Sequence, residues 1–219
     1  MLRTTRRQLF KLLLMYGAVY SALRSRVVSG LSLFGSKAAK RIVAKGTPLS
    51  SLIHADPAEL DARNLATSSM EVFDVMGDTV YRVDLQNWRL AVDGAVQRPS
   101  EFTYEELVAR PSIERNVLLI CPGFFAYNGK WKGFSVARLL EEVGFDPRAT
   151  HIKFSGLEGI RRNTKRYKIE DVNDDRLFLA YRVNGEPLPE RHGFPLRLVA
   201  EGHKGRRWVK YVNRIVVVS

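Results

Sequence analysis

The stretch LFLAYRVNG, residues 177–185, decides the fold class of this chain. Its first seven residues are mostly apolar, have the length of a β-strand and end at a turn signal. The Asn184-Gly185 pair that follows is a strong signal for a tight hairpin turn, because both residues adopt positive φ at low cost. The stretch therefore predicts a strand that leads into a β-hairpin.

Further short strands are predicted on both sides of this hairpin, and few helices accompany them. Thr103 and Glu106 have the spacing of a capping box and predict a short helix. Ser135 predicts the start of a second helix that runs to about Val143, with Gly144 as its C-terminal cap. Many short strands with few helices predict an α+β, β-rich fold with a single core domain. The further strands are predicted at residues 88–94, 117–120, 151–154, 196–200, 208–212 and 214–218.

The basic balance of the chain comes from its N-terminal segment. The chain carries 35 Lys and Arg against 23 Asp and Glu. Residues 1–45 hold ten of the basic residues and no acidic one, which leaves 25 basic and 23 acidic residues in the remainder. Because the excess is confined to one end, it argues against a nucleic-acid-binding or basic membrane-surface protein, and we expect no nucleic-acid partner.

Residues 1–45 have the layout of an export signal. Arg6-Arg7 precedes an apolar run at residues 12–23, which resembles a twin-arginine signal. The run is too short to span a bilayer comfortably, since that needs about 20 residues. We expect a twin-arginine export signal or N-terminal anchor, the twin-arginine export machinery as a partner, and a periplasmic or exported protein. The alternative is a basic amphipathic helix that lies on a membrane.

Two further parts are predicted after this segment. Residues 46–70 contain Pro48, Pro57 and the cluster Thr67-Ser68-Ser69, and they predict a polar linker or lead-in. From residue 71 the patterning becomes that of a globular domain, which is predicted to run over residues 71–219.

Cys121 stands out among the residues that carry chemistry. It is the one cysteine of the chain, which excludes an intramolecular disulfide. The four histidines show no zinc-ligand spacing, and neither a phosphate loop nor a dinucleotide fingerprint is present. Cys121 follows the apolar run 117–120 and precedes Pro122-Gly123, so it is predicted at the end of a buried strand, where sites are commonly displayed. Its thiolate would suit a soft metal centre, although a lone cysteine is more often an inert buried residue.

Four blocks of sequence, taken together, resemble the molybdopterin-dependent oxidoreductases of the sulfite oxidase type, a family that includes the catalytic subunit of periplasmic methionine sulfoxide reductase. The first runs from Trp88 to Gly94 and is followed by Pro99. The second is Cys121 with Trp131-x-Gly133 ten residues later. The third and longest covers residues 179–199, and the fourth is Gly205-x-x-Trp208-Val209-Lys210.

The resemblance implies a sulfite oxidase-type fold and a molybdenum-molybdopterin cofactor. Cys121 matches the family cysteine that binds the metal and would be both the metal ligand and the catalytic residue. The chain departs from the family at Glu71-Val72-Phe73-Asp74, where an Asn or His is usual, and at residues 122–127, where sulfite oxidases carry an arginine. The positions that the resemblance assigns to cofactor binding are Ser155, His192, Arg197, Trp208, Val209 and Lys210.

The resemblance also implies a function. We expect an exported enzyme that catalyses two-electron oxygen-atom transfer on a small substrate, with sulfur-containing compounds as candidates, and that exchanges electrons with a separate haem or quinone partner. The alternative is a non-catalytic binding module that keeps the molybdopterin fold. Basic side chains at Arg161, Arg162, Lys165 or Arg166 would attract an anionic substrate, or they form a solvated loop.

Overall fold

The computed structural model describes residues 39–76, 80–157 and 163–219. Residues 40–219 form one unit by their contacts. Most of the predicted export signal, including Arg6 and Arg7, lies outside the described residues. Within the described part of the chain, no helix is long and apolar enough to cross a membrane.

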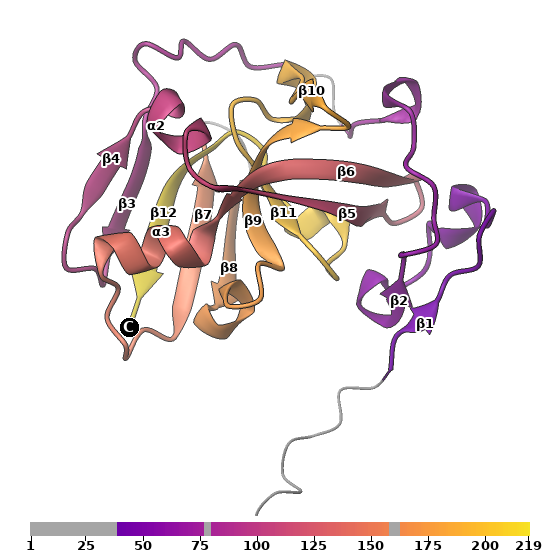
Figure 1. Cartoon of the computed structure of the whole chain (residues 1–219), viewed down its shortest axis with the longest axis horizontal. Helices are drawn as coiled ribbons and strands as arrows, with labels where there is room; N and C mark the ends of the chain where they lie inside the picture. Colours follow the sequence, from indigo (N-terminus) through magenta and orange to yellow (C-terminus); the bar gives the residue numbers. More distant parts are fainter. Residues whose placement is uncertain (1–38, 77–79, 158–162) are drawn as a thin grey trace, which may run out of the picture. The chain divides into compact units, whose positions relative to one another are not determined.

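Two five-stranded sheets make up the domain (Figure 1). The first contains the hairpin that the sequence predicts, and its neighbouring strands all run antiparallel. Asn184 and Gly185 both have positive φ, at 53° and 83°, as the predicted turn requires. The strands of this first sheet are, in order across it, β10 (Glu186–Pro187), β9 (Leu177–Val183), β6 (Phe125–Ser135) and β5 (Ser112–Cys121), with β11 (Arg197–Ala200) also paired to β9.

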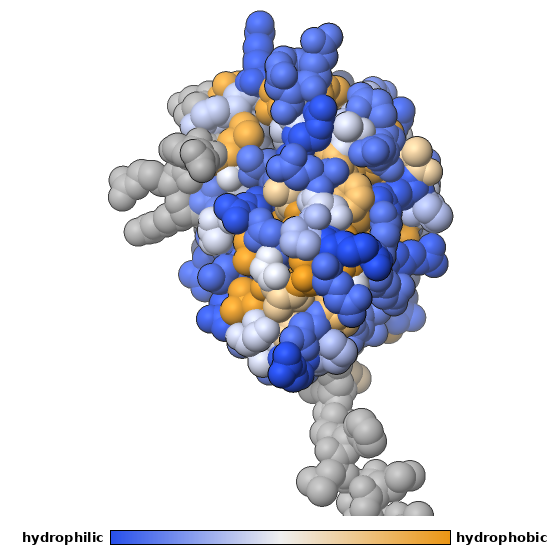
Figure 2. Space-filling view, turned by 90° about the vertical axis from the view of Figure 1, so that its left-hand side faces the viewer, coloured by the Kyte–Doolittle hydropathy of each residue, from blue (hydrophilic) through white to orange (hydrophobic). Residues whose placement is uncertain are grey.

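The second sheet brings the C-terminal strand β12 between strands from the first half of the domain. β12 pairs parallel with β3 and antiparallel with β7. Figure 2 shows the side of the molecule on which β4 lies in Figure 1. Small groups of hydrophobic residues are exposed on this side, and hydrophilic residues separate them. The order across the sheet is β4 (Ser100–Phe102), β3 (Leu90–Gly94), β12 (Val212–Val218), β7 (His151–Gly156) and β8 (Thr164–Lys168).

Both predicted helices are present and are capped as expected. In α2 (Tyr104–Val108) the Thr103 hydroxyl accepts from the Glu106 N–H while the Glu106 carboxylate accepts from the Thr103 N–H. In α3 (Val136–Val143) the Ser135 hydroxyl accepts from the Arg138 N–H, and Gly144 ends the helix in the left-handed region. Short 3-10 helices lie at Leu49–Leu52, Pro57–Glu59, Met70–Val72, Ile169–Val172, Glu190–His192 and Gly205–Arg207.

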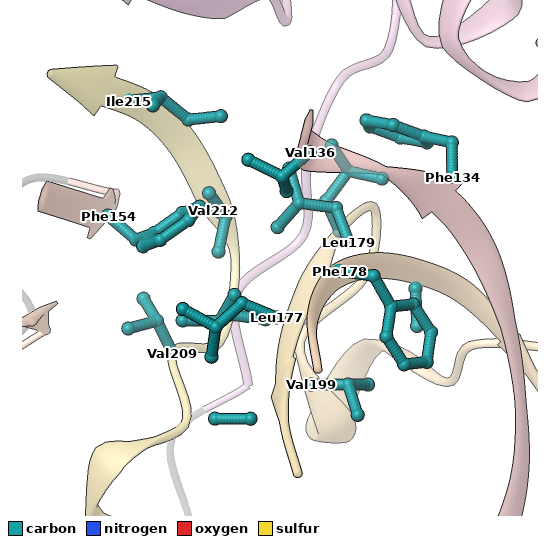
Figure 3. Close-up of a cluster of buried hydrophobic side chains, with 14 of the residues drawn as sticks. Phe134, Val136, Phe154, Leu177, Phe178, Leu179, Val199, Val209, Val212 and Ile215 are labelled. Atoms are coloured by element: carbon teal, nitrogen blue, oxygen red, sulfur yellow. The ribbon is translucent and has the colours of Figure 1, made fainter. Parts of the chain in front are cut away.

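The core consists of apolar side chains from both sheets. Figure 3 shows Phe154 of β7 beside Val212 and Ile215 of β12, with Leu177 and Leu179 of β9 nearby. All five are fully buried, at 0% exposure. Full burial of such a side chain contributes about 1.5–3 kcal/mol. These residues give the sheets that support the site a fixed relative position.

The segment predicted as a polar linker or lead-in packs against the domain. β1 (Arg41–Ile42) pairs parallel with β2 (Leu60–Asp61). Leu118 and Ile120 of β5 contact a small apolar cluster from this segment, whereas Leu119 faces the main core. The second half of β5, residues 117–121, is thus buried on both faces, which explains its continuous apolar run. The segment contributes Leu52, Leu60 and Leu65 to the cluster, and Val43, from the end of the predicted export segment, joins them.

The predicted strand at 208–212 is wrong. Val209 makes an isolated bridge to Leu198, and Tyr211 has a φ of 55°, which breaks extended geometry. The strand β12 begins only at Val212. Conversely, the long strand β6 is absent from the sequence prediction, because Gly129 and Gly133 interrupt its apolar pattern.

Candidate functional site

Cys121 lies at the end of β5, where the chain turns into β6. The Phe124 N–H donates to the Cys121 carbonyl oxygen at 3.0 Å, and Gly123 takes a φ of 77°. This turn places Cys121 in the wall of a cavity of about 440 Å³. The other lining residues are Asp74, Val75, Met76, Pro122, Phe124, Phe125, Arg197, Gly205, Arg206, Trp208 and Lys210.

The Cys121 thiol is buried against Gly205. A Cβ atom on Gly205 would lie 2.5 Å from the Cys121 Sγ, so this position tolerates only glycine without a shift of the sulfur. Burial raises the pKa of the Cys121 thiol, and the positive charges of Arg197 and Lys210 lower it in part. A buried thiol held in this way ionises readily only when a further cation, such as a metal, replaces its proton.

Arg197 of β11 is a buried cation without an acidic partner among the described ion pairs. Its Nη1 donates to the His192 carbonyl oxygen at 2.7 Å, while its Nε has no hydrogen-bond partner. Burial lowers the pKa of Arg197 to about 10. A guanidinium that remains charged at neutral pH and lacks a counter-ion suits an anionic ligand.

Lys210 lies on the same wall of the cavity. Its Nζ donates to the Arg191 carbonyl oxygen at 3.0 Å. Burial, followed by the like charge of Arg197, lowers the pKa of Lys210 to about 8. Trp208 lines the cavity next to it and donates from its Nε1 to the His203 carbonyl oxygen. The chain approaches Gly193 closely here, since a Cβ on Gly193 would lie 2.8 Å from the Lys210 Cβ.

His192 is buried and neutral behind these cations. It is 3% exposed, and its Nδ1 has no hydrogen-bond partner. Burial, together with the nearby positive charges of Arg197 and Lys210, lowers the pKa of His192 to about 3. The imidazole is therefore a neutral donor or acceptor at physiological pH.

Two predicted cofactor residues lie elsewhere. Ser155 lines a separate cavity of about 730 Å³ together with Asn163 and Arg214, and its Oγ accepts from the Thr164 hydroxyl at 3.0 Å. Val209 is fully buried, and its carbonyl oxygen accepts from the Leu198 N–H. The structure thus brings Cys121, Arg197, Trp208 and Lys210 into one cavity with His192 near it, and it does not bring Ser155 or Val209 to that cavity.

The basic residues expected to attract a substrate are also not gathered at this cavity. Arg161 and Arg162 lie outside the described residues. Arg166 is in β8, where its guanidinium lies 2.9 Å from His151 Nδ1 beside a different cavity. The basic side chain at the Cys121 cavity that sequence reasoning missed is Arg206.

Sequence reasoning also missed the wall formed by residues 74–76 and the aromatic residue before it, Phe73. Asp74, Val75 and Met76 line the cavity, and Phe73 stacks on His192. The sequence showed this segment only as a departure from the family pattern. Its one usable signal was Phe73, an aromatic residue at the end of a polar stretch.

The residues at this site fit a molybdopterin cofactor. The two orphaned buried nitrogens, Arg197 Nε and His192 Nδ1, call for polar ligand atoms. The positive charges of Arg197 and Lys210 favour binding of an anion, and the Cys121 sulfur is a soft metal ligand. No group of three or more His, Cys, Asp or Glu among the described residues could hold a metal ion. A metal at Cys121 would therefore need further ligands from a cofactor.

Comparison with known proteins agrees with this geometry. A nitrate reductase of Brassica napus is 32% identical over 169 residues, which is 64% of this chain and 19% of that protein. A nitrate reductase of Arabidopsis thaliana is 32% identical over 168 residues, 63% of this chain and 18% of that protein. This chain thus spans about a fifth of the length of these relatives.

Among solved structures, the sulfane dehydrogenase SoxCD of Paracoccus pantotrophus superposes with a TM-score of 0.60 and 28% identity, over 64% of this chain and 40% of that one. This match confirms the predicted β-rich, sulfite oxidase-type fold. The oxidoreductase molybdopterin binding domain family matches residues 76–219. These findings confirm the predicted molybdopterin cofactor, while ligation by Cys121 stays a prediction. The chain belongs to the family of oxidoreductase molybdopterin-binding domains.

Proposed function

We propose that this chain is the catalytic unit of an exported molybdenum enzyme that transfers one oxygen atom and two electrons to or from a small substrate. The observation that carries the proposal is the cavity around Cys121. It joins one buried thiol to two cations, Arg197 and Lys210, and neither cation pairs with an acidic side chain among the described residues. Such a site favours a large anionic group that carries a soft metal.

Each residue has a role toward that group. Cys121 would supply one anionic sulfur to the metal, and Gly205 leaves space for that sulfur. Arg197 and Lys210 would hold anionic oxygens of the cofactor, while the unpartnered Nδ1 of His192 would bind the pterin. When bound, the cofactor supplies a centre that exchanges two electrons and one oxygen atom with a substrate.

The substrate that we propose is a small compound, with sulfur-containing molecules as the first candidates. The relatives named above act on nitrate and on a sulfane, which are both small. The aromatic pair Phe124 and Phe125 replaces the arginine that sulfite oxidases carry after their cysteine, which disfavours sulfite itself.

The electron partner and the location belong to the same proposal. We expect a separate haem or quinone partner and export by the twin-arginine route, which carries folded proteins and so permits cofactor insertion in the cytoplasm. The export test replaces Arg6 and Arg7 by Lys, which keeps the charge and removes the recognised pair. Normal arrival of the double variant in the periplasm would refute the twin-arginine route.

Elemental analysis tests the enzyme proposal. Protein produced in a host that makes molybdopterin should contain about one molybdenum per chain, and Cys121→Ser should change the metal's spectrum because its soft sulfur ligand is lost. Folded protein without molybdenum from such a host would refute the enzyme and support the non-catalytic binding module.

A further inference from the structure

We propose that Phe73 is a positioning residue for the molybdopterin cofactor, acting through His192 and Arg197. Phe73 lies before residues 76–219, which match the family, and three residues after the end of the lead-in segment, residues 46–70. The inference rests on the cofactor that the family binds and not on the reaction proposed above.

Three aromatic rings form a column that ends at His192. The Phe73 ring stacks on the His192 ring with centroids 3.6 Å apart and planes 6° from parallel. Its opposite face stacks on Tyr127, with centroids 4.1 Å apart and planes at 12°. Among the described residues, no other aromatic ring contacts His192, so the stack with Phe73 fixes the plane of the imidazole. That plane determines where the unpartnered Nδ1 points.

Phe73 also borders the buried cation. The Arg197 guanidinium carbon lies 5.8 Å from the centroid of Phe73, 5.6 Å from that of Trp131 and 5.4 Å from that of Trp208. Trp131 and Trp208 come from the family-matched part of the domain, and Phe73 supplies the third ring. Aromatic faces stabilise a desolvated guanidinium, so Phe73 helps to keep Arg197 charged and confined.

The far end of the ring column is anchored by Asn184. The Asn184 Nδ2 donates to the Tyr127 hydroxyl at 2.8 Å and to the Ser68 carbonyl oxygen at 2.7 Å. The Tyr127 hydroxyl in turn donates to the Met70 sulfur at 3.4 Å. One side chain of the β9–β10 turn therefore ties the column and the lead-in segment to the first sheet.

A second asparagine fixes the lead-in segment just before Phe73. Asn128 is fully buried, and its Nδ2 donates to the carbonyl oxygens of Leu65 and Ala66 at 3.1 Å each. Its backbone N–H donates to the Ser68 hydroxyl at 3.1 Å. The backbone that leads to Phe73 is thus held at Leu65, Ala66 and Ser68. These contacts place the ring against His192 before any cofactor binds.

The test measures how fast the holoenzyme loses molybdopterin. Phe73→Leu keeps an apolar side chain but removes both ring stacks, so we expect dissociation about tenfold faster than in the wild type. The matched control is Phe102→Leu in β4, which removes a buried ring that does not line the cavity. It should release molybdopterin at the wild-type rate.

A double-mutant cycle separates positioning from a purely structural role. If Phe73 acts mainly through His192, Phe73→Leu should accelerate release much less in a His192→Ala background. An equal acceleration in both backgrounds, or a wild-type rate in Phe73→Leu alone, would overturn the inference.

Two further measurements keep the inference testable if Phe73→Leu folds poorly. Asn184→Gly preserves the positive φ of the turn but releases the far end of the column, and it should accelerate loss by a smaller factor, about threefold. In cofactor-free wild-type protein, the His192 ring protons should show a strong ring-current shift by NMR. Absence of that shift would contradict the stack, whereas a wild type that binds no molybdopterin would instead refute the cofactor assignment.

Discussion

The cavity around Cys121 has two walls of opposite character. One wall, from β11 and residues 205–210, carries Arg197, Lys210 and the glycine against the sulfur. The other, from residues 74–76, carries the apolar side chains of Val75 and Met76 and the carboxylate of Asp74. Under our proposal, the first wall would supply charge for the cofactor, and the second would supply shape. The two walls come from parts of the chain that are more than 100 residues apart.

The largest effect should come from the residue that both walls enclose. Cys121→Ser removes the soft anionic ligand, so turnover should fall by more than about a hundredfold. The two side chains are close in size, and under our proposal Arg197, Lys210 and His192 would still bind the pterin, so melting temperature and molybdopterin content should stay near those of the wild type. Activity assays, thermal unfolding and pterin fluorescence check this. A fully active Cys121→Ser protein would make Cys121 an ordinary buried residue.

The next effect concerns the charged wall. Arg197→Ala removes a charge-assisted contact worth about 1.5–3 kcal/mol, so affinity for molybdopterin should fall by about 10- to 150-fold. Arg148→Ala is the matched control, because Arg148 is an exposed arginine that pairs with Asp146 away from the cavity. Equal cofactor content in both variants would show that the charged wall does not bind the cofactor.

The buried imidazole of His192, behind the charged wall, should make the cofactor-free protein acid-sensitive. The folded-state pKa of His192 is about 3, below the unfolded value of about 6.5, so the unfolded chain binds the proton first as pH falls. Stability is therefore present above pH 6.5 and is lost towards pH 3. The loss from His192 should be about 2 kcal/mol between pH 6.5 and 4.5. Urea unfolding of wild type and His192→Gln measures it, and identical pH slopes would contradict the burial argument.

The smallest expected effect is a change in the pKa of the Cys121 thiol, which responds to charges on both walls. Asp74 raises the pKa of Cys121 and Lys210 lowers it. Asp74→Asn should therefore lower this pKa, and Lys210→Met should raise it. The rate of thiol alkylation against pH in cofactor-free protein gives both values. Shifts in the same direction would mean that the substitutions act by changing access to the sulfur rather than through charge.

The charged wall was largely predictable from the sequence, and the positioning wall was not. Arg197, Trp208 and Lys210 stand in blocks whose order and spacing resemble a family, so their proximity to Cys121 follows from a shared fold. Phe73 and Asp74 stand in a short irregular segment without periodicity, and nothing local indicates what they contact. The sequence pattern predicted that Asn184 lies in a turn. The hydrogen bonds from the Asn184 side chain to Ser68 and Tyr127 could not be predicted, because they depend on residues far away in sequence.

By itself, the sequence determined the local features of this protein. Strand β9 and its hairpin, the capped helices α2 and α3 and the turn after Cys121 depend on apolar runs and on backbone preferences of a few neighbouring residues. Only the tertiary structure decided that Ser155 lines a different cavity from Cys121, that residues 208–212 do not form a strand, and that Phe73 stacks on His192. These outcomes depend on how the two sheets and the lead-in segment pack, because packing selects contacts between residues that no local pattern connects.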